Sequence, residues 1–204
     1  MTHEELCAHF GYESVGVSHE GLASAEKDGQ MFHIHPDGTP AYEGCFNFVG
    51  DFHEGLARAR KGAWWFHIRR DGTPSYKERF GWIPVILGDF KEGMAVVVNL
   101  GDEKHTIHSQ FHIRSNGKPA YEERYDFVGP FFEGLAMAVK DGLDFHIRSN
   151  GKPAYKERSF VDLSQFRGGS AWVQKGDERY LIYPDGTPVS GERRKGHMKD
   201  VEYV

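Results

Sequence analysis

One eleven-residue motif dominates the sequence, with four closely similar copies and one degenerate copy. Its pattern is Phe-His-Ile-x-x-Asp/Asn-Gly-x-Pro-x-Tyr. The copies run from Phe32 to Tyr42, Phe66 to Tyr76, Phe111 to Tyr121 and Phe145 to Tyr155, with the degenerate one from Tyr180 to Ser190. Similar copies are expected to fold alike and to pack against one another, so the repeat constrains the fold more than any other feature.

Each copy predicts a β-hairpin. Phe and Ile lie two residues apart and therefore face one side of a strand, while the His between them faces the other side. Asp-Gly or Asn-Gly supplies the turn, because Gly adopts positive φ without steric cost. Two registers fit the pattern, with either Phe or His opposite Tyr. We favour Phe opposite Tyr, because this places Phe, Ile and Tyr on one apolar face.

A second motif, Gly-Leu-Ala or a close variant, precedes each hairpin. Its glycines are Gly21, Gly55, Gly93, Gly134 and Gly169, which lie 34, 38, 41 and 35 residues apart. The small residue two places later is always alanine: Ala23, Ala57, Ala95, Ala136 and Ala171. A constant alanine indicates a place where strands crowd together. The unit is therefore expected to be a meander of a Gly-Leu-Ala, a Phe-His-Ile and a Pro-x-Tyr strand, with residues 125–129 as a candidate fourth strand.

We predict an all-β protein of five meander repeats, each about 34–41 residues long. A five-bladed, propeller-like ring is the favoured arrangement, and an open β-solenoid or fan is the alternative, which would leave exposed sheet edges. Residues 1–13 are expected to form a lead-in, with Thr2 and Glu5 capping a short helix. Residues 14–193 would form one domain of five repeats, and residues 194–204 a basic tail.

The combination of Phe-x-x-Gly-Leu-Ala-x-Ala, a Lys-Asp-Gly turn and an aromatic-x-Ile strand ending in Asp-Gly resembles the bacterial WG-repeat (KWG-repeat) proteins. The resemblance extends over about residues 12–193. The Trp-Gly pair that names those repeats is replaced here, for example by Asp144-Phe145 or Trp65-Phe66. The resemblance implies a β-rich array of generally unassigned activity, and it supplies no catalytic residues.

Composition argues against several functional classes. The net charge of −5 gives no reason to expect nucleic-acid binding, and no apolar run approaches the length of a membrane span. The N-terminus lacks a secretory signal, and two cysteines, Cys7 and Cys45, suit a reducing compartment, so a cytoplasmic location is expected. No nucleophile elbow, P-loop, His-Glu-x-x-His or dinucleotide fingerprint is present, so we expect a non-enzyme without a cofactor.

Histidines are the candidate metal ligands. The repeated ones are His33, His67, His112 and His146. In a closed ring they could face a common axis and bind a divalent transition metal. The alternative, which we favour, is that each makes the same local hydrogen bond or stacking contact in its own repeat. A second group, Asp102, Glu103, His105 and His108, could bind a metal weakly, but a solvated loop is the favoured interpretation.

Arginines and tryptophans are the candidate ligand- or partner-binding residues. Arg79, Arg124 and Arg158 each follow a Glu just after the motif tyrosine. They could line repeated pockets for carboxylate or phosphate, although cross-repeat ion pairs are the simpler interpretation. Trp64, Trp82 and Trp172 fall outside the motif and could form an exposed binding patch, whereas most aromatic residues should be core.

Three functions fit these observations. The favoured one is a non-catalytic repeat scaffold that binds a protein partner, because repeat arrays present broad binding faces. The second is a multivalent binder of small ligands or glycans with sites between repeats. The third is a metal-binding protein that uses the repeated histidines. The metal content of the purified protein would separate the third from the other two.

Overall fold

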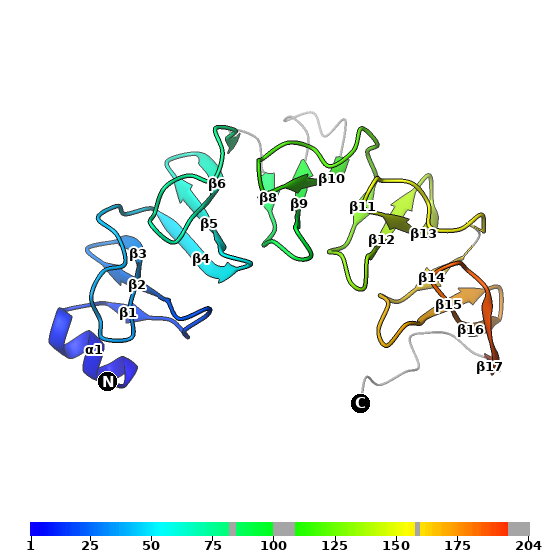
Figure 1. Ribbon diagram of the computed structural model, residues 1–204, viewed down its shortest axis with the longest axis horizontal. Coiled ribbons are helices and arrows are strands. Elements are labelled where there is room, and N and C mark those ends of the chain that lie inside the picture. The colour runs from blue at the N-terminus through cyan, green and yellow to red at the C-terminus, as the bar shows by residue number, and fades with distance from the viewer. Residues whose placement is uncertain (82–84, 100–108, 158–159, 196–204) are drawn as a thin grey trace.

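The computed structural model describes residues 1–81, 85–99, 109–157 and 160–195. Five small antiparallel sheets follow one another along an arc, and a short helix precedes the first sheet (Figure 1). We number the sheets as blades 1 to 5 in chain order. The prediction of an all-β, propeller-like array of five repeats is confirmed.

The helix α1 spans His3–Phe10. Blade 1 consists of β1 (Ser14–Val15), β2 (Ala23–Lys27) and β3 (Gln30–Ile34), and blade 2 of β4 (Phe48–His53), β5 (Leu56–Lys61), β6 (Trp64–Ile68) and β7 (Phe80–Gly81). Blade 3 contains β8 (Val85–Leu87), β9 (Met94–Asn99) and β10 (Ser109–Arg114), and blade 4 contains β11 (Phe127–Val128), β12 (Leu135–Lys140) and β13 (Leu143–Arg148). Blade 5 contains β14 (Asp162–Leu163), β15 (Ala171–Lys175), β16 (Glu178–Ile182) and β17 (Pro188–Lys195).

The strand composition of a blade differs from the expected meander. The first strand is the segment before Gly-Leu-Ala, and the Gly-Leu-Ala and Phe-His-Ile strands are the second and third. In blades 1 to 4 the Pro-x-Tyr segment forms bends instead of a strand, and its only pairing there is one bridge per blade, as between Ile34 and Pro40. In blade 5 the corresponding segment begins the strand β17. An aromatic residue further on completes the blade, as where Phe80 of β7 pairs with Trp65. Proline cannot donate to a ladder, which limits the pairing of the return segment in these four blades.

The register within the hairpin agrees with the favoured one, because the Ile34–Pro40 bridge places Phe32 opposite Tyr42. The side chain of Tyr42, however, does not share the apolar face of Phe32 and Ile34, contrary to the prediction from the sequence. Its hydroxyl oxygen lies 2.6 Å from Nδ1 of His33, so it turns to the histidine side of the hairpin.

The arc is open. Blade 1 and blade 5 lie at its opposite ends (Figure 1). Within the described residues, β1 pairs with β2 and β17 pairs with β16, so neither terminal strand completes a sheet at the other end. The blades therefore follow the open fan, the alternative arrangement, and not the favoured closed ring.

Both ends of the array add structure to the repeats. Thr2 and Glu5 form the predicted capping box of α1, and Leu6 and Phe10 of this helix pack over Gly38 of blade 1. At the other end, β17 continues through Lys195, so the fifth repeat extends two residues beyond its predicted boundary. No helix in the described part of the chain has the length and apolar character to span a bilayer.

Close packing inside and between blades explains the small residues of the motifs. Ala57, Ala59 and Ala95 have no exposed surface, which confirms the crowding expected from the sequence. Between blades, Gly72 has φ of +76°, and a Cβ at this glycine would lie 2.7 Å from the ring of Tyr42. The turn glycine of one blade is therefore needed both for its backbone conformation and to seat the tyrosine of the preceding blade.

A glutamate ladder also joins the blades. The hairpin loops between the first and second strands lie on the concave side of the arc (Figure 1). In these loops the carboxylate of Glu92 accepts hydrogen bonds from the N–H groups of Glu133 (2.7 Å) and Gly134 (2.8 Å). Glu54 binds the loop of blade 3 in the same way, Glu133 binds that of blade 5, and Glu20 makes one bond to Gly55.

Candidate ligand-binding site

The four repeated histidines join consecutive blades. Each has Nδ1 within 2.5–2.7 Å of the hydroxyl of its own motif tyrosine and Nε2 within 2.8–3.0 Å of a backbone carbonyl in the next blade. The carbonyls belong to Gly50, Gly88, Gly129 and Ser164, in chain order. Each imidazole also packs against a phenylalanine of the next blade, Phe52, Phe90, Phe131 or Phe166.

These contacts define the protonation state of the imidazoles. A carbonyl oxygen can only accept, so Nε2 carries the proton, and the tyrosine hydroxyl donates to an unprotonated Nδ1. Burial lowers the pKa of His67, His112 and His146 to about 4 and also lowers that of His33. Neutral imidazole is therefore the form that the folded blades hold at pH 7.

The arrangement corrects the prediction of a shared metal site at His33, His67, His112 and His146. Each histidine lies in a different blade interface, and both of its ring nitrogens are hydrogen-bonded to protein. Among the described residues, no group of three or more His, Cys, Asp or Glu is arranged to hold a metal ion. The other metal candidates, Asp102, Glu103, His105 and His108, lie outside the described residues.

Two of the predicted arginines, Arg79 and Arg124, bind groups within their own blades. Nη1 of Arg79 donates to the carbonyls of Tyr76, Lys77 and Glu78 at 2.8–3.0 Å, and its guanidinium lies 4.4 Å from the ring centre of Phe66. Arg124 makes the same set of contacts in blade 3, over Phe111 at 4.1 Å.

The interpretation of these two arginines as partners in cross-repeat ion pairs is therefore wrong. One such pair does join blades 4 and 5, between Lys175 and Glu157 at 2.9 Å. Arg158 lies outside the described residues.

The tryptophans do not form one patch. Trp64 is 45% exposed on blade 2, Trp172 is on blade 5, and Trp82 lies outside the described residues. Trp64 borders a cavity of about 390 Å³ that Arg79 also lines, and Trp172 borders a larger one.

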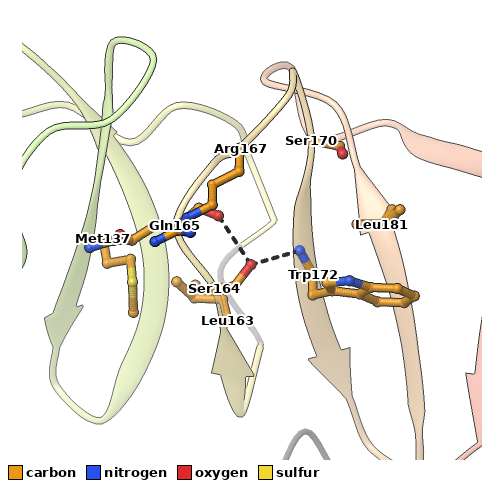
Figure 2. A pocket seen from close by; sticks show the side chains of 8 residues that line it. All are labelled: Met137, Leu163, Ser164, Gln165, Arg167, Ser170, Trp172 and Leu181. Carbon is orange, nitrogen blue, oxygen red and sulfur yellow. Dashed lines mark hydrogen bonds between the residues drawn. The ribbon is translucent and has the colours of Figure 1, made fainter. Parts of the chain in front are cut away.

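The larger cavity, of about 610 Å³, lies between blades 4 and 5 (Figure 2). We call it the blade 4–5 cleft. Its lining consists of Met137, Leu163, Ser164, Gln165, Arg167, Ser170, Trp172 and Leu181. Figure 2 shows Met137 and Gln165 on one side and Trp172 with Leu181 on the other. Its volume is within the usual range for small-ligand and peptide pockets.

Ser164 holds the floor of the cleft in place. Its Oγ accepts from the N–H of Trp172 at 2.9 Å and donates to the carbonyl of Gln165 at 3.1 Å, as the dashed lines in Figure 2 mark. Its own carbonyl accepts from Nε2 of His146. The carboxylate of Glu133 binds the adjacent loop through the N–H groups of Gly168 and Gly169. The cleft is thus built on a loop fixed from both blades.

The chain also departs from its repeat at several positions around the cleft. Trp172 occupies the position of Ser24, Arg58, Val96 and Met137 in the other blades. Ser170 replaces a Leu or Met, Ser164 replaces a Gly, and Leu181 replaces the motif His. Together with these residues, the Arg167 guanidinium and the Gln165 amide line one space. This set can stack on a planar or apolar group and hydrogen-bond to a polar one.

Among the predicted binding residues that the structure describes, Trp172 alone lies in this cleft; Arg167, Gln165 and Ser170 were not predicted. Position-by-position comparison of the repeats would have revealed Ser170, which replaces a Leu or Met, but not Arg167 or Gln165, whose positions vary from repeat to repeat. The same comparison would have revealed the ladder glutamates, since Glu20, Glu54, Glu92 and Glu133 all precede the Gly of Gly-Leu-Ala.

Comparison with known families supports the repeat assignment. The family model described as WG containing repeat matches residues 34–65 and 113–143. These two segments of the β-rich chain are thus similar to the WG-type repeat. No curated protein sequence matches it.

Among solved structures, the chain is similar to Hsv2 of Kluyveromyces lactis with loop 6CD replaced by a Gly-Ser linker. The identity is 11%, the TM-score is 0.50, and the match covers 88% of this chain and 69% of that one. A second structure of K. lactis Hsv2 (11%, TM-score 0.40, 93% and 66% covered) and YCF48 bound to D1 peptide (12%, 0.40, 89% and 67%) are also similar. The first match indicates a propeller-like fold.

Proposed function

We propose that this protein is a non-catalytic repeat scaffold that binds a partner protein through the blade 4–5 cleft. One observation carries the proposal: residues that break the repeat gather around one cavity, whereas the repeated His, Tyr and Glu side chains are occupied in joining blades. In this proposal an exposed peptide segment of the partner inserts an apolar or aromatic side chain against Trp172, and Arg167 and Gln165 bind its polar groups.

The test uses peptides selected from a random displayed library on the immobilised protein. Trp172→Ala should weaken the selected peptides by about 100-fold, the loss typical of a central aromatic anchor. The matched control is Trp64→Ala, which removes an exposed tryptophan from blade 2 and should change affinity by less than about twofold. Equal loss in both variants, or none in Trp172→Ala, would overturn the proposal.

A glycan or small-ligand binder remains the second candidate, because the cleft lies between two repeats and presents a tryptophan to its contents. Tryptophan faces can stack on flat apolar surfaces of a ligand. The expected multivalency is harder to support, because the equivalent position in blade 2 carries Arg58, whose Nε is bonded to Asp89 at 2.6 Å. Specific binding on a glycan array, with loss in Trp172→Ala, would favour this candidate over a protein partner.

A further inference from the structure

A cavity in blade 1 lies where blades 2 and 3 hold an arginine of their own. It measures about 440 Å³ and is lined by Phe32, Pro40, Tyr42, Glu43, Gly44 and Cys45. Cys45 follows the motif Tyr42 by three residues, as Arg79 follows Tyr76 and Arg124 follows Tyr121. A short side chain thus stands in blade 1 where the other two blades have a guanidinium.

Arg79 shows what this part of a repeat binds. One of its nitrogens donates to three successive carbonyls, those of Tyr76, Lys77 and Glu78, and its plane lies over the ring of Phe66. Arg124 repeats every one of these contacts in blade 3. The bend after the motif is therefore a guanidinium receptor built from backbone carbonyls and an aromatic ring.

The same receptor backbone is present in blade 1. The bend begins at the Ile34–Pro40 bridge and ends at the bridge to Phe46, as the blade 2 bend begins at Pro74 and ends at Phe80. The carbonyls of residues 42, 43 and 44 correspond to those that bind Arg79. Within the part of the chain that the structure describes, these three carbonyls accept no hydrogen bond.

The motif tyrosine of blade 1 is also more exposed than those of blades 2 and 3. Tyr42 is half-buried, whereas Tyr76 and Tyr121 are each only 8% exposed. Glu43 is exposed at the rim of the cavity, where its carboxylate adds a negative charge. Aromatic face, free carbonyls and carboxylate all favour a planar cation in this space.

We propose that the blade 1 cavity binds the guanidinium group of an arginine side chain from a partner protein. The cation would stack on Phe32 and donate to the carbonyls of Tyr42, Glu43 and Gly44. A lysine ammonium fits less well, because it has no planar face to stack on Phe32. The site is remote from the blade 4–5 cleft, and the proposal does not depend on that cleft being used.

Residues next to the bound arginine would have a surface to contact. The cavity bordered by Trp64 shares Gly44 and Cys45 with the blade 1 cavity, so the two adjoin. Lys61 and Arg79 line the second cavity. We therefore expect peptides with an acidic residue near the arginine to bind more tightly than those with a second basic residue.

The thiol of Cys45 provides a direct readout of occupancy, because it is exposed and forms part of the cavity wall. In a Cys7→Ala background it is the only thiol. The rate of iodoacetamide alkylation should fall by about tenfold at saturating blocked tripeptide with a central arginine, since the stacked guanidinium covers the sulfur. Two control tripeptides replace the central arginine. Citrulline keeps the planar shape but has no charge, and lysine keeps the charge but has no planar group. Equal protection by all three, or protection by none, would overturn the proposal.

Cys45→Arg provides an independent test, because it should place an intramolecular guanidinium in the cavity. Calorimetric binding of the arginine tripeptide should be lost in Cys45→Arg and retained in Cys45→Ser. The urea midpoint of Cys45→Arg should also rise above that of the parent. Undiminished binding to a folded Cys45→Arg would contradict the proposal, and if that variant does not fold, the alkylation experiment decides.

Discussion

Nε2 of His67 lies 3.0 Å from the carbonyl oxygen of Gly88, which joins a side chain of blade 2 to the backbone of blade 3. Nδ1 of the same ring lies 2.7 Å from the hydroxyl of Tyr76, so the imidazole is held from both sides. The relationship recurs at three further interfaces. The repeated histidine thus connects blades, which explains why the motif recurs without marking a shared active site.

Replacement of His67 should therefore destabilise the array. His67→Ala leaves the Gly88 carbonyl and the Tyr76 hydroxyl without their partner and opens a cavity, so we expect a loss of about 3 kcal/mol in the free energy of unfolding. Urea unfolding followed by tryptophan fluorescence measures it. His35→Ala removes an exposed histidine of blade 1 and should change stability by less than about 0.5 kcal/mol. Similar losses in the two variants would contradict the inferred role.

Stability should also fall as the pH is lowered from about 6.5 to about 4. The folded state holds the pKa of His67, His112 and His146 at about 4, whereas an unfolded histidine titrates near 6.5. Between these values the unfolded chain binds protons that the folded chain does not, which favours unfolding. Between these two pH values each histidine makes the free energy of unfolding fall by at most about 1.4 kcal/mol per pH unit. Above pH 6.5 and below pH 4 its effect on the slope disappears, because both states then bind the same number of protons.

A single variant isolates this effect. His112→Gln retains an amide that can donate to the carbonyl of Gly129, but it does not titrate. The number of protons taken up on unfolding at pH 5 should fall by about one relative to the parent. Urea midpoints measured at intervals from pH 4 to pH 7 give this number. An unchanged pH dependence would show that His112 titrates alike in both states.

Much of the fold could be predicted from local patterns. The alternation in Phe-His-Ile marked the third strand of four blades, the Asp-Gly and Asn-Gly pairs marked the turns, and the constant alanine after Gly-Leu marked the crowded second strand. Thr2 and Glu5 predicted the capped helix. The strands, turns and cap follow from properties of neighbouring residues and can be read from a single repeat, whereas the constant alanine requires comparison of the five copies.

Contacts between blades were less predictable. The partner of His67 is a backbone carbonyl 21 residues further along the chain, and a carbonyl leaves no trace in the sequence. Arg79 was paired in the prediction with acidic side chains, but it binds three carbonyls of its own bend. The opening of the arc depends on the small rotation between packed blades, which no motif encodes. The blade 4–5 cleft arises from substitutions spread over four segments.

The turn glycine provides a test of blade packing. Gly151 has φ of +77°, and a Cβ there would lie 2.5 Å from Cγ of Tyr121, whereas Gly142 has φ of +73° with nothing within 4 Å. Both alanine variants suffer the backbone strain of about 1 kcal/mol, but Gly151→Ala adds a clash worth a further 1–3 kcal/mol, roughly. Thermal unfolding should therefore rank Gly151→Ala well below Gly142→Ala. Equal melting temperatures would mean that Tyr121 moves aside freely.

The glutamate ladder predicts a smaller, graded effect on the concave side. Glu92→Ala removes two hydrogen bonds, to the N–H groups of Glu133 and Gly134, from an exposed loop. We expect a loss of about 1 kcal/mol, because water partly replaces the carboxylate there. Glu92→Gln keeps one acceptor oxygen and should lose about half as much.

Hydrogen exchange locates this effect in the structure. Protection of the Glu133 and Gly134 amides should fall in Glu92→Ala, while the amides of the blade 3 loop, bound by Glu54, should keep theirs. Glu122→Ala removes an exposed glutamate of the same blade and should leave both sets unchanged. Loss of protection in both loops on Glu92→Ala would mean that the carboxylates act as one cooperative unit instead of a series of separate joints.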